Sequence, residues 1–201
     1  MQGGRRMKSY FRVTNISAHP FENTYVKRVL DKIKSKLHYD NPDRHIHICD
    51  PFSNNKTIRD QGSNLITNDL NPNFDSTYNL EANDFGELME REGKLFDLVL
   101  FDPPYSLRQL KDCYEGIGKE LPHWQSQNMS GRCKDALASC VRPGGYVISF
   151  GWSSHGFGKR RGFEKQEIHN LEQAGKDGRY NIQIVIEKKI NNNLFAYYST
   201  D

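Results

Sequence analysis

The chain has 201 residues, 36% of them hydrophobic, and it carries a formal net charge of +3 with a pI near 8.6. That length suits one domain with its own core, and the weak positive charge permits a polyanionic partner without requiring one. No apolar run approaches the roughly 20 residues of a membrane span, and the first residues lack the apolar segment of a signal peptide. We therefore predict a cytoplasmic protein with no membrane partner.

The N-terminal residues 1–17 have the composition of a basic tail, and a single domain is expected over residues 18–201. The first predicted element is an amphipathic helix over residues 21–37, which Asn23 or Thr24 can cap. Five apolar side chains fall on one face of this helix: Val26, Val29, Leu30, Ile33 and Leu37.

Two short strands follow, over residues 45–52 and 64–72, and each runs into a turn that contains an acid. A helix over residues 84–92 is closed by Gly93. Residues 95–102 form the most apolar strand of the chain, which predicts a central position in a sheet.

Two further helices are predicted over residues 106–117 and 129–141, and the second of them stops at Pro143-Gly144-Gly145. A strand over residues 146–152 comes next. It is the fourth strand of the predicted order.

Residues 163–171 fit neither the helical nor the strand pattern clearly. Residues 180–189 alternate isoleucines with polar residues, which predicts a half-buried strand, antiparallel at the end of the sheet. Strands that alternate with helices indicate an α/β fold with a mostly parallel sheet and one antiparallel strand near the C-terminus.

Acids stand at the ends of three predicted strands, at Asp50, Asp69 and Asp102. Ligands of open α/β sheets bind outside the carboxyl ends of the strands. We therefore expect these three side chains to line one crevice.

The acid after the central strand is followed by Pro103, Pro104 and Tyr105. Each proline fixes its own φ and pushes the preceding residue toward an extended conformation, so Asp102 and the Pro103 carbonyl point in fixed directions. A planar amine would donate its two N–H hydrogens to these acceptors and stack on Tyr105, with its lone pair directed at an electrophilic methyl group. The plainer interpretation is a strand that ends in a turn, with Tyr105 packed in the core.

The sequence Asp-Pro-Pro-Tyr at 102–105 resembles the catalytic motif of amino-methyltransferases that act on adenine N6 or cytosine N4. The chain is most similar to small phage-type adenine methylases, over residues 18–152 and in a tail from Ser149-Phe150-Gly151-Trp152 to Gly162-Phe163-Glu164. This resemblance implies a Rossmann-like S-adenosylmethionine-dependent methyltransferase fold and a DNA adenine N6 methyltransferase. It implies four catalytic residues: Asp102, Pro103, Pro104 and Tyr105.

The same resemblance implies where S-adenosylmethionine binds. The segment 50–52 looks like the start of the cofactor loop, 68–72 resembles the segment whose acid holds the ribose, and 82–85 the segment whose acid meets the adenine. The implied cofactor-binding residues are Asp50, Pro51, Phe52, Ser53, Asp69, Leu70, Asp84 and Phe85. Taken alone, Asp69 also suits a turn and Asp84 a helix cap.

The cofactor loop departs from the family in one respect. It carries Ser53-Asn54-Asn55 where glycines are usual. Asparagine tolerates a left-handed φ better than most residues, so the turn can be kept.

A basic loop over residues 155–165 places charged side chains among glycines and aromatics. Beside a base-modifying site, we expect these side chains to contact DNA phosphates; the plainer interpretation is a solvated loop. The expected nucleic-acid-binding residues are Lys159, Arg160, Arg161 and Lys165. A target adenine in a duplex has to be flipped out, and no long insert is present to recognise its sequence, so short loops, a homodimer or an accessory protein must supply that choice.

No metal is expected. His45 and His47 alternate on one strand without a third ligand nearby, and the four cysteines form no CxxC pair, which indicates reduced thiols. Three other functions stay open: an RNA methyltransferase acting on guanine N2 or adenine N6, a protein glutamine methyltransferase, and a nucleic-acid-binding relative without catalysis. Cofactor binding separates the last from the others, and a substrate panel separates the first two.

Overall fold

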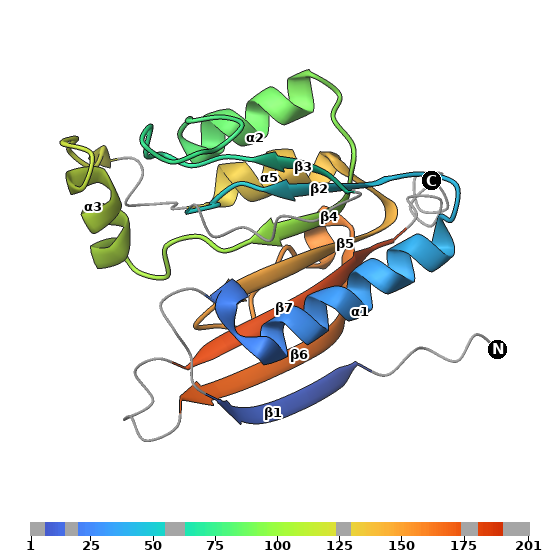
Figure 1. Cartoon of the computed structure of the whole chain (residues 1–201). Helices are drawn as coiled ribbons and strands as arrows, with labels where there is room; N and C mark the ends of the chain where they lie inside the picture. Colours follow the sequence, from blue (N-terminus) through green and yellow to red (C-terminus); the bar gives the residue numbers. More distant parts are fainter. Residues whose placement is uncertain (1–6, 15–19, 55–62, 124–129, 174–180, 191–201) are drawn as a thin grey trace, which may run out of the picture.

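The computed structural model of the chain describes residues 7–14, 20–54, 63–123, 130–173 and 181–190. These residues form a sheet of seven strands with helices on both faces (Figure 1). Across the sheet the strands lie in the order β1 (Lys8–Thr14), β6 (Phe163–Gln173), β7 (Ile182–Lys189), β5 (Val141–Gly151), β4 (Phe96–Phe101), β2 (Ile46–Asp50) and β3 (Ser63–Thr67).

Of these seven strands, only β7 runs opposite to the others. It pairs antiparallel with β5 on one side and with β6 on the other, whereas β1–β6, β2–β3, β2–β4 and β4–β5 are parallel pairs. The predicted fold class, a mostly parallel α/β sheet with an antiparallel strand near the C-terminus, is confirmed. Because β2, β3, β4 and β5 are parallel, their carboxyl ends meet at one edge of the sheet.

Helix α1 (Thr24–Asp40) covers one face of the sheet and follows the predicted pattern (Figure 1). The Asn23 side chain caps it by accepting hydrogen bonds from the amides of Tyr25 and Val26. The five apolar residues of its predicted face are all buried, against a cluster that includes Leu98 and Leu100 of β4.

Helices α2 (Ala82–Arg91) and α5 (Gly131–Ser139) pack on the opposite face. There they bury Val99 and Phe101, the alternate residues of β4, which explains why this strand is apolar throughout. Helix α3 (Leu107–Glu115) follows the carboxyl end of β4, and two short 3₁₀ turns, η1 (Pro20–Glu22) and η2 (Lys159–Arg161), complete the described elements. No helix within the described ranges is long and apolar enough to cross a membrane.

The structure corrects the assignment of residues 1–17 to a tail for residues 8–14, which form β1; residues 1–6 and 15–17 lie outside the described residues. This strand pairs with β6 over seven residues, and the ring of Tyr10 stacks on His169 with centroids 4.6 Å apart. Its partner lies about 160 residues further along the chain, so no local pattern marks it.

Strand β5 also begins earlier than predicted, at Val141, and runs through Pro143-Gly144-Gly145. Val141 pairs with Phe96 before the register shifts. Gly144 has a φ of 81°, and a Cβ at Gly145 would come within 3.0 Å of the Asp97 carbonyl oxygen, so both glycines are needed where β5 passes β4. The ambiguous residues 163–171 belong to β6.

Candidate active site

The loops after β2 and β3 are joined by backbone hydrogen bonds at the carboxyl edge of the sheet. The Asn68 amide donates to the Asp50 carbonyl at 2.8 Å, and the Ser53 amide donates to the Asn68 carbonyl at 2.9 Å. The Asn54 amide donates to Oδ2 of Asp69 at 2.8 Å. Segments that the sequence assigned separately to the cofactor therefore form one connected surface.

The turn after β2, in the loop expected to bind the cofactor, is built on Asn54. Its φ is 42°, and among the residues that the structure describes it is the only non-glycine with a positive φ. Asparagine visits this left-handed region at a lower cost than most side chains. The expectation that asparagine can support the turn without glycine is confirmed.

Asp69 is the carboxylate that connects these loops. Its Oδ1 accepts from the Asn71 amide and its Oδ2 from the Asn54 amide, both at 2.8 Å. Burial raises the pKa of Asp69 above its ordinary value, and these two amide donors offset part of that effect. A carboxylate offers about four acceptor positions, so each oxygen keeps capacity for a further donor such as a hydroxyl group.

The remaining residues of the first loop are held in place by burial. Asp50 is fully buried, and its Oδ1 accepts from the Phe52 amide at 3.0 Å. Pro51 is buried as well, and Ser53 is buried with its hydroxyl 2.8 Å from that of Ser76. The half-buried Phe52 stands edge-on to Phe101 at 5.2 Å, which places this loop against the end of β4.

The segment expected at the cofactor adenine lies at the start of α2. Leu80 exchanges hydrogen bonds with the Asn68 side chain, so α2 begins close to the end of β3. Asp84 is exposed in the first turn, and the helix is capped by Glu81 and not by Asp84. Phe85 is fully buried, so its side chain belongs to the core, while Leu70 is half-buried beside Asp69.

Asp102 and Tyr105 form a hydrogen-bonded pair directly after β4. The Tyr105 hydroxyl donates to Oδ1 of Asp102 at 2.5 Å. Burial raises the pKa of Asp102 to about 6, against the lowering effect of the Tyr105 donor. Burial and the neighbouring carboxylate raise the pKa of Tyr105, so the phenol stays neutral and remains a donor.

Tyr105 is partly buried against the core cluster that includes Phe150, as the plainer interpretation expected, and it also makes polar and aromatic contacts after β4. Its amide donates to the Gln109 side chain at 2.6 Å, and its ring stands edge-on to Trp152 with centroids 5.9 Å apart. Trp152, directly after β5, is 53% exposed. The sequence predicted that Asp102 would take a target amine, yet Tyr105 occupies one oxygen of this carboxylate. An amine would therefore use the other oxygen or displace the hydroxyl.

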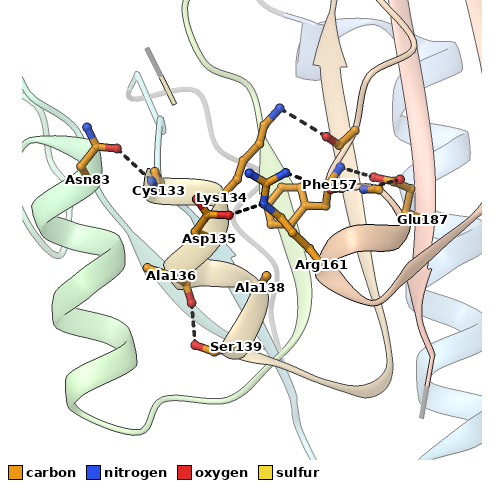
Figure 2. Close-up of polar contacts among 12 residues, drawn as sticks. Asn83, Cys133, Lys134, Asp135, Ala136, Ala138, Ser139, Phe157, Arg161 and Glu187 are labelled. Atoms are coloured by element: carbon orange, nitrogen blue, oxygen red, sulfur yellow. Dashed lines mark hydrogen bonds and ion pairs between the residues drawn. The ribbon is translucent and has the colours of Figure 1, made fainter. Parts of the chain in front are cut away.

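The basic loop is anchored by Glu187 of β7, as Figure 2 shows. This buried carboxylate accepts from the amides of Phe157 and Gly158 at 2.5 and 3.0 Å. Arg161 pairs with Asp135 of α5 at 2.7 Å and donates to the Phe157 carbonyl.

The four predicted DNA contacts therefore differ in their surroundings. Lys159 and Arg160 are exposed, Arg161 has structural partners, and Lys165 is half-buried in β6. The sequence prediction did not distinguish them. It also gave no individual role to Lys134, Trp152 or Glu187. Glu187 could have been noticed, because it is an acid directly after the alternating isoleucines of a predicted strand. Lys134 could not, because its sequence context is that of any lysine on a helix surface.

No metal centre is built from the residues that the structure describes: no three of their His, Cys, Asp and Glu side chains are grouped to hold an ion. All four cysteines are free thiols, and Cys49, Cys133 and Cys140 are buried. Burial raises the pKa of each of these three thiols, so they are poor nucleophiles.

No protein-family model matches the chain, and no curated protein matches it in sequence. Among solved structures it is similar to the SAM-dependent methyltransferase from Agrobacterium tumefaciens, with a TM-score of 0.54 and 12% identity over 87% of this chain and 63% of that one. The chain has the S-adenosylmethionine-dependent methyltransferase fold. The chain is also similar to TrmN from Thermus thermophilus, with a TM-score of 0.47 and 17% identity over 78% of this chain and 48% of that one. A further similar structure is the N-methyltransferase NodS from Bradyrhizobium japonicum in complex with S-adenosyl-L-homocysteine, with a TM-score of 0.48 and 10% identity over 87% of this chain and 90% of that one. This chain thus spans about half of TrmN and less than two thirds of the Agrobacterium enzyme.

Proposed function

We propose that the chain transfers a methyl group from S-adenosylmethionine to the exocyclic N6 amine of adenine in DNA. The observation that carries this proposal is the Asp102–Tyr105 pair at the carboxyl end of β4. Phe101, the residue before Asp102, contacts Phe52 of the expected cofactor loop. A carboxylate acceptor therefore lies next to the place where a methyl donor would bind.

The residues at this edge fit S-adenosylmethionine. The Asn54 turn keeps the loop after β2 in a conformation that usually requires glycine, and Asp69 retains acceptor capacity for the two ribose hydroxyls. Asp84 is exposed near the end of β3, where it could accept from an adenine amine. The bound cofactor would supply an electrophilic methyl group.

The chain's own residues would orient the target amine and take its proton. An ionised Asp102 accepts one amine N–H, which aims the nitrogen lone pair away from the carboxylate, and the aromatic rings of Tyr105 and Trp152 offer faces for a flipped base. A methylated amine is strongly acidic until it loses a proton. A carboxylate whose pKa is about 6 accepts that proton more readily than an exposed aspartate does.

The experiment that tests this proposal offers labelled S-adenosylmethionine with DNA, RNA and bulk protein in parallel. We expect label in DNA alone, in N6-methyladenine after digestion to nucleosides, and none with Asp102→Ala. Label in RNA or protein but not in DNA would show that DNA is not the substrate. A parent that fails to bind the cofactor in calorimetry would overturn the enzyme assignment.

A further inference from the structure

An open cavity of about 370 Å³ lies beside the basic loop, between α5 and β6. Its wall includes the start of α5, the loop after β5, η2 and β6. Four basic or imidazole side chains line it: Lys134, His155, Arg161 and Lys165.

Lys134 holds a central place in this wall. Its ammonium lies 5.3 Å from the centre of the Phe101 ring. It also donates to the Gly156 carbonyl oxygen at 3.4 Å, the contact drawn as a dashed line from Lys134 in Figure 2. Burial lowers the pKa of Lys134, and the positive charge of Arg161 lowers it further. The carboxylate of Glu187 offsets part of this effect, and an anion in the cavity would add to that favourable interaction with the Lys134 ammonium.

The acids near this cavity are engaged with other groups. Asp135 pairs with Arg161, and Glu187 accepts from the amides of Phe157 and Gly158 behind the loop. A Cβ at Gly156 would overlap the Glu187 carboxylate, so the loop can lie this close only because residue 156 is glycine. The fold therefore fixes the loop with its carboxylates and leaves the ammonium groups of Lys134 and Lys165 at the cavity wall.

We infer that this cavity binds a backbone phosphate of the DNA strand next to the target nucleotide, with Lys134 and Lys165 as its principal ligands. The inference rests on the proposed function. Lys134 packs on Phe101, the residue before Asp102, so a phosphate here would sit close to the catalytic end of β4. The volume exceeds that of a phosphate alone and admits the adjoining sugars, and ammonium groups bind phosphates without reading a base.

A suitable probe is a short single-stranded oligodeoxynucleotide made only of abasic sites, which presents phosphates and sugars without bases. Its affinity is measured across a salt titration for the parent, Lys134→Gln and Lys165→Gln, with thermal melts to show that each variant folds. Lys94→Gln is the matched control, because Lys94 is a partly exposed lysine paired with Glu92 near the amino end of β4.

Lys134→Gln should weaken binding about tenfold or more at low salt, the loss typical of one charge-assisted hydrogen bond. The slope of log affinity against log salt should fall by about 0.7, the value for one contact to a single strand. Lys165→Gln should act in the same direction, and Lys94→Gln should change affinity less than about twofold. Unchanged affinity and slope in both cavity variants would overturn the inference.

Calorimetry with S-adenosylmethionine separates this inference from the proposed function. A parent that does not bind the cofactor, yet binds the abasic probe through Lys134, would contradict the function and support the phosphate site. A parent that methylates DNA, with probe binding independent of Lys134 and Lys165, would overturn the phosphate site alone.

Discussion

Replacing Asp102 with asparagine should abolish methyl transfer and at the same time stabilise the fold. Burial raises the pKa of Asp102 from 3.8 to about 6, so the ionised form is disfavoured in the native state. The raised pKa means that the native state favours the protonated carboxyl. The protonated carboxyl therefore stabilises the native state, and this contribution is complete below pH about 4 and is lost as the pH rises to about 6. An asparagine oxygen can still accept from the Tyr105 hydroxyl, so the substitution removes charge without removing the hydrogen bond.

The magnitude follows from the shift of about two pKa units. At about 1.4 kcal/mol per unit, the ionised carboxylate costs about 3 kcal/mol at pH 8, and roughly half of that at pH 5. The Asp102 residue as a whole is only half-buried, so residual contact with water makes about 3 kcal/mol an upper value for the cost of ionisation. For a chain of this length, 3 kcal/mol corresponds to a rise in Tm of about 6–12 °C.

Parallel melts of the parent and Asp102→Asn at pH 5 and pH 8, with methyl-transfer assays at pH 8, measure both effects. We expect the Tm difference to be largest at pH 8 and to shrink toward pH 5. A difference independent of pH would refute the reasoning, because it would show that the carboxylate carries no ionisation cost. If Asp102→Asn retained methyl-transfer activity, the Asp102 carboxylate would have no role in the reaction.

Three other outcomes are expected. The initial rate of methyl transfer by the parent should fall below pH about 6, because protonated Asp102 cannot accept the amine hydrogen or the proton it releases; a flat profile from pH 5 to 8 would contradict this role. Asp69→Ala should weaken S-adenosylmethionine binding by roughly 1.5–3 kcal/mol in calorimetry. The control is Asp75→Ala, which removes an exposed acid from the segment after Asp69 and should leave the dissociation constant unchanged. Trp152→Ala should cost roughly 1–3 kcal/mol of affinity for adenine-containing single strands and nothing for the abasic probe, whereas an equal loss for both would argue against base stacking.

Local patterns predicted much of this structure because they report burial. The apolar face of α1 and the continuous apolar run of β4 reflect contacts that each element makes along its whole length. Parallel strands also have to end at one edge, and Asp50, Asp69 and Asp102 all lie at or just after strand ends at that edge. The expected crevice lined by all three was wrong for Asp50, because this side chain is fully buried.

The features that sequence missed depend on partners far along the chain. Strand β1 is defined by its pairing with β6, and the early start of β5 is defined by Phe96 across a register shift. The hydrogen bond from Tyr105 to Asp102 is a choice of side-chain rotamer, which no spacing encodes. Lys134 becomes notable only because the loop after β5 folds over it.

The placement of β7 has a consequence for how the protein is made. This strand, Ile182–Lys189, lies between β5 and β6, and its Glu187 fixes the loop beside the cavity. Until β7 has been synthesised, β5 and β6 lack the strand that joins them, and the amides of Phe157 and Gly158 lack their acceptor, Glu187. Because β1 in turn pairs with β6, it also waits for a partner far along the chain, and such long-range pairing is typical of slow folding. The loop beside the cavity therefore reaches its final position only after β7 has been synthesised and paired.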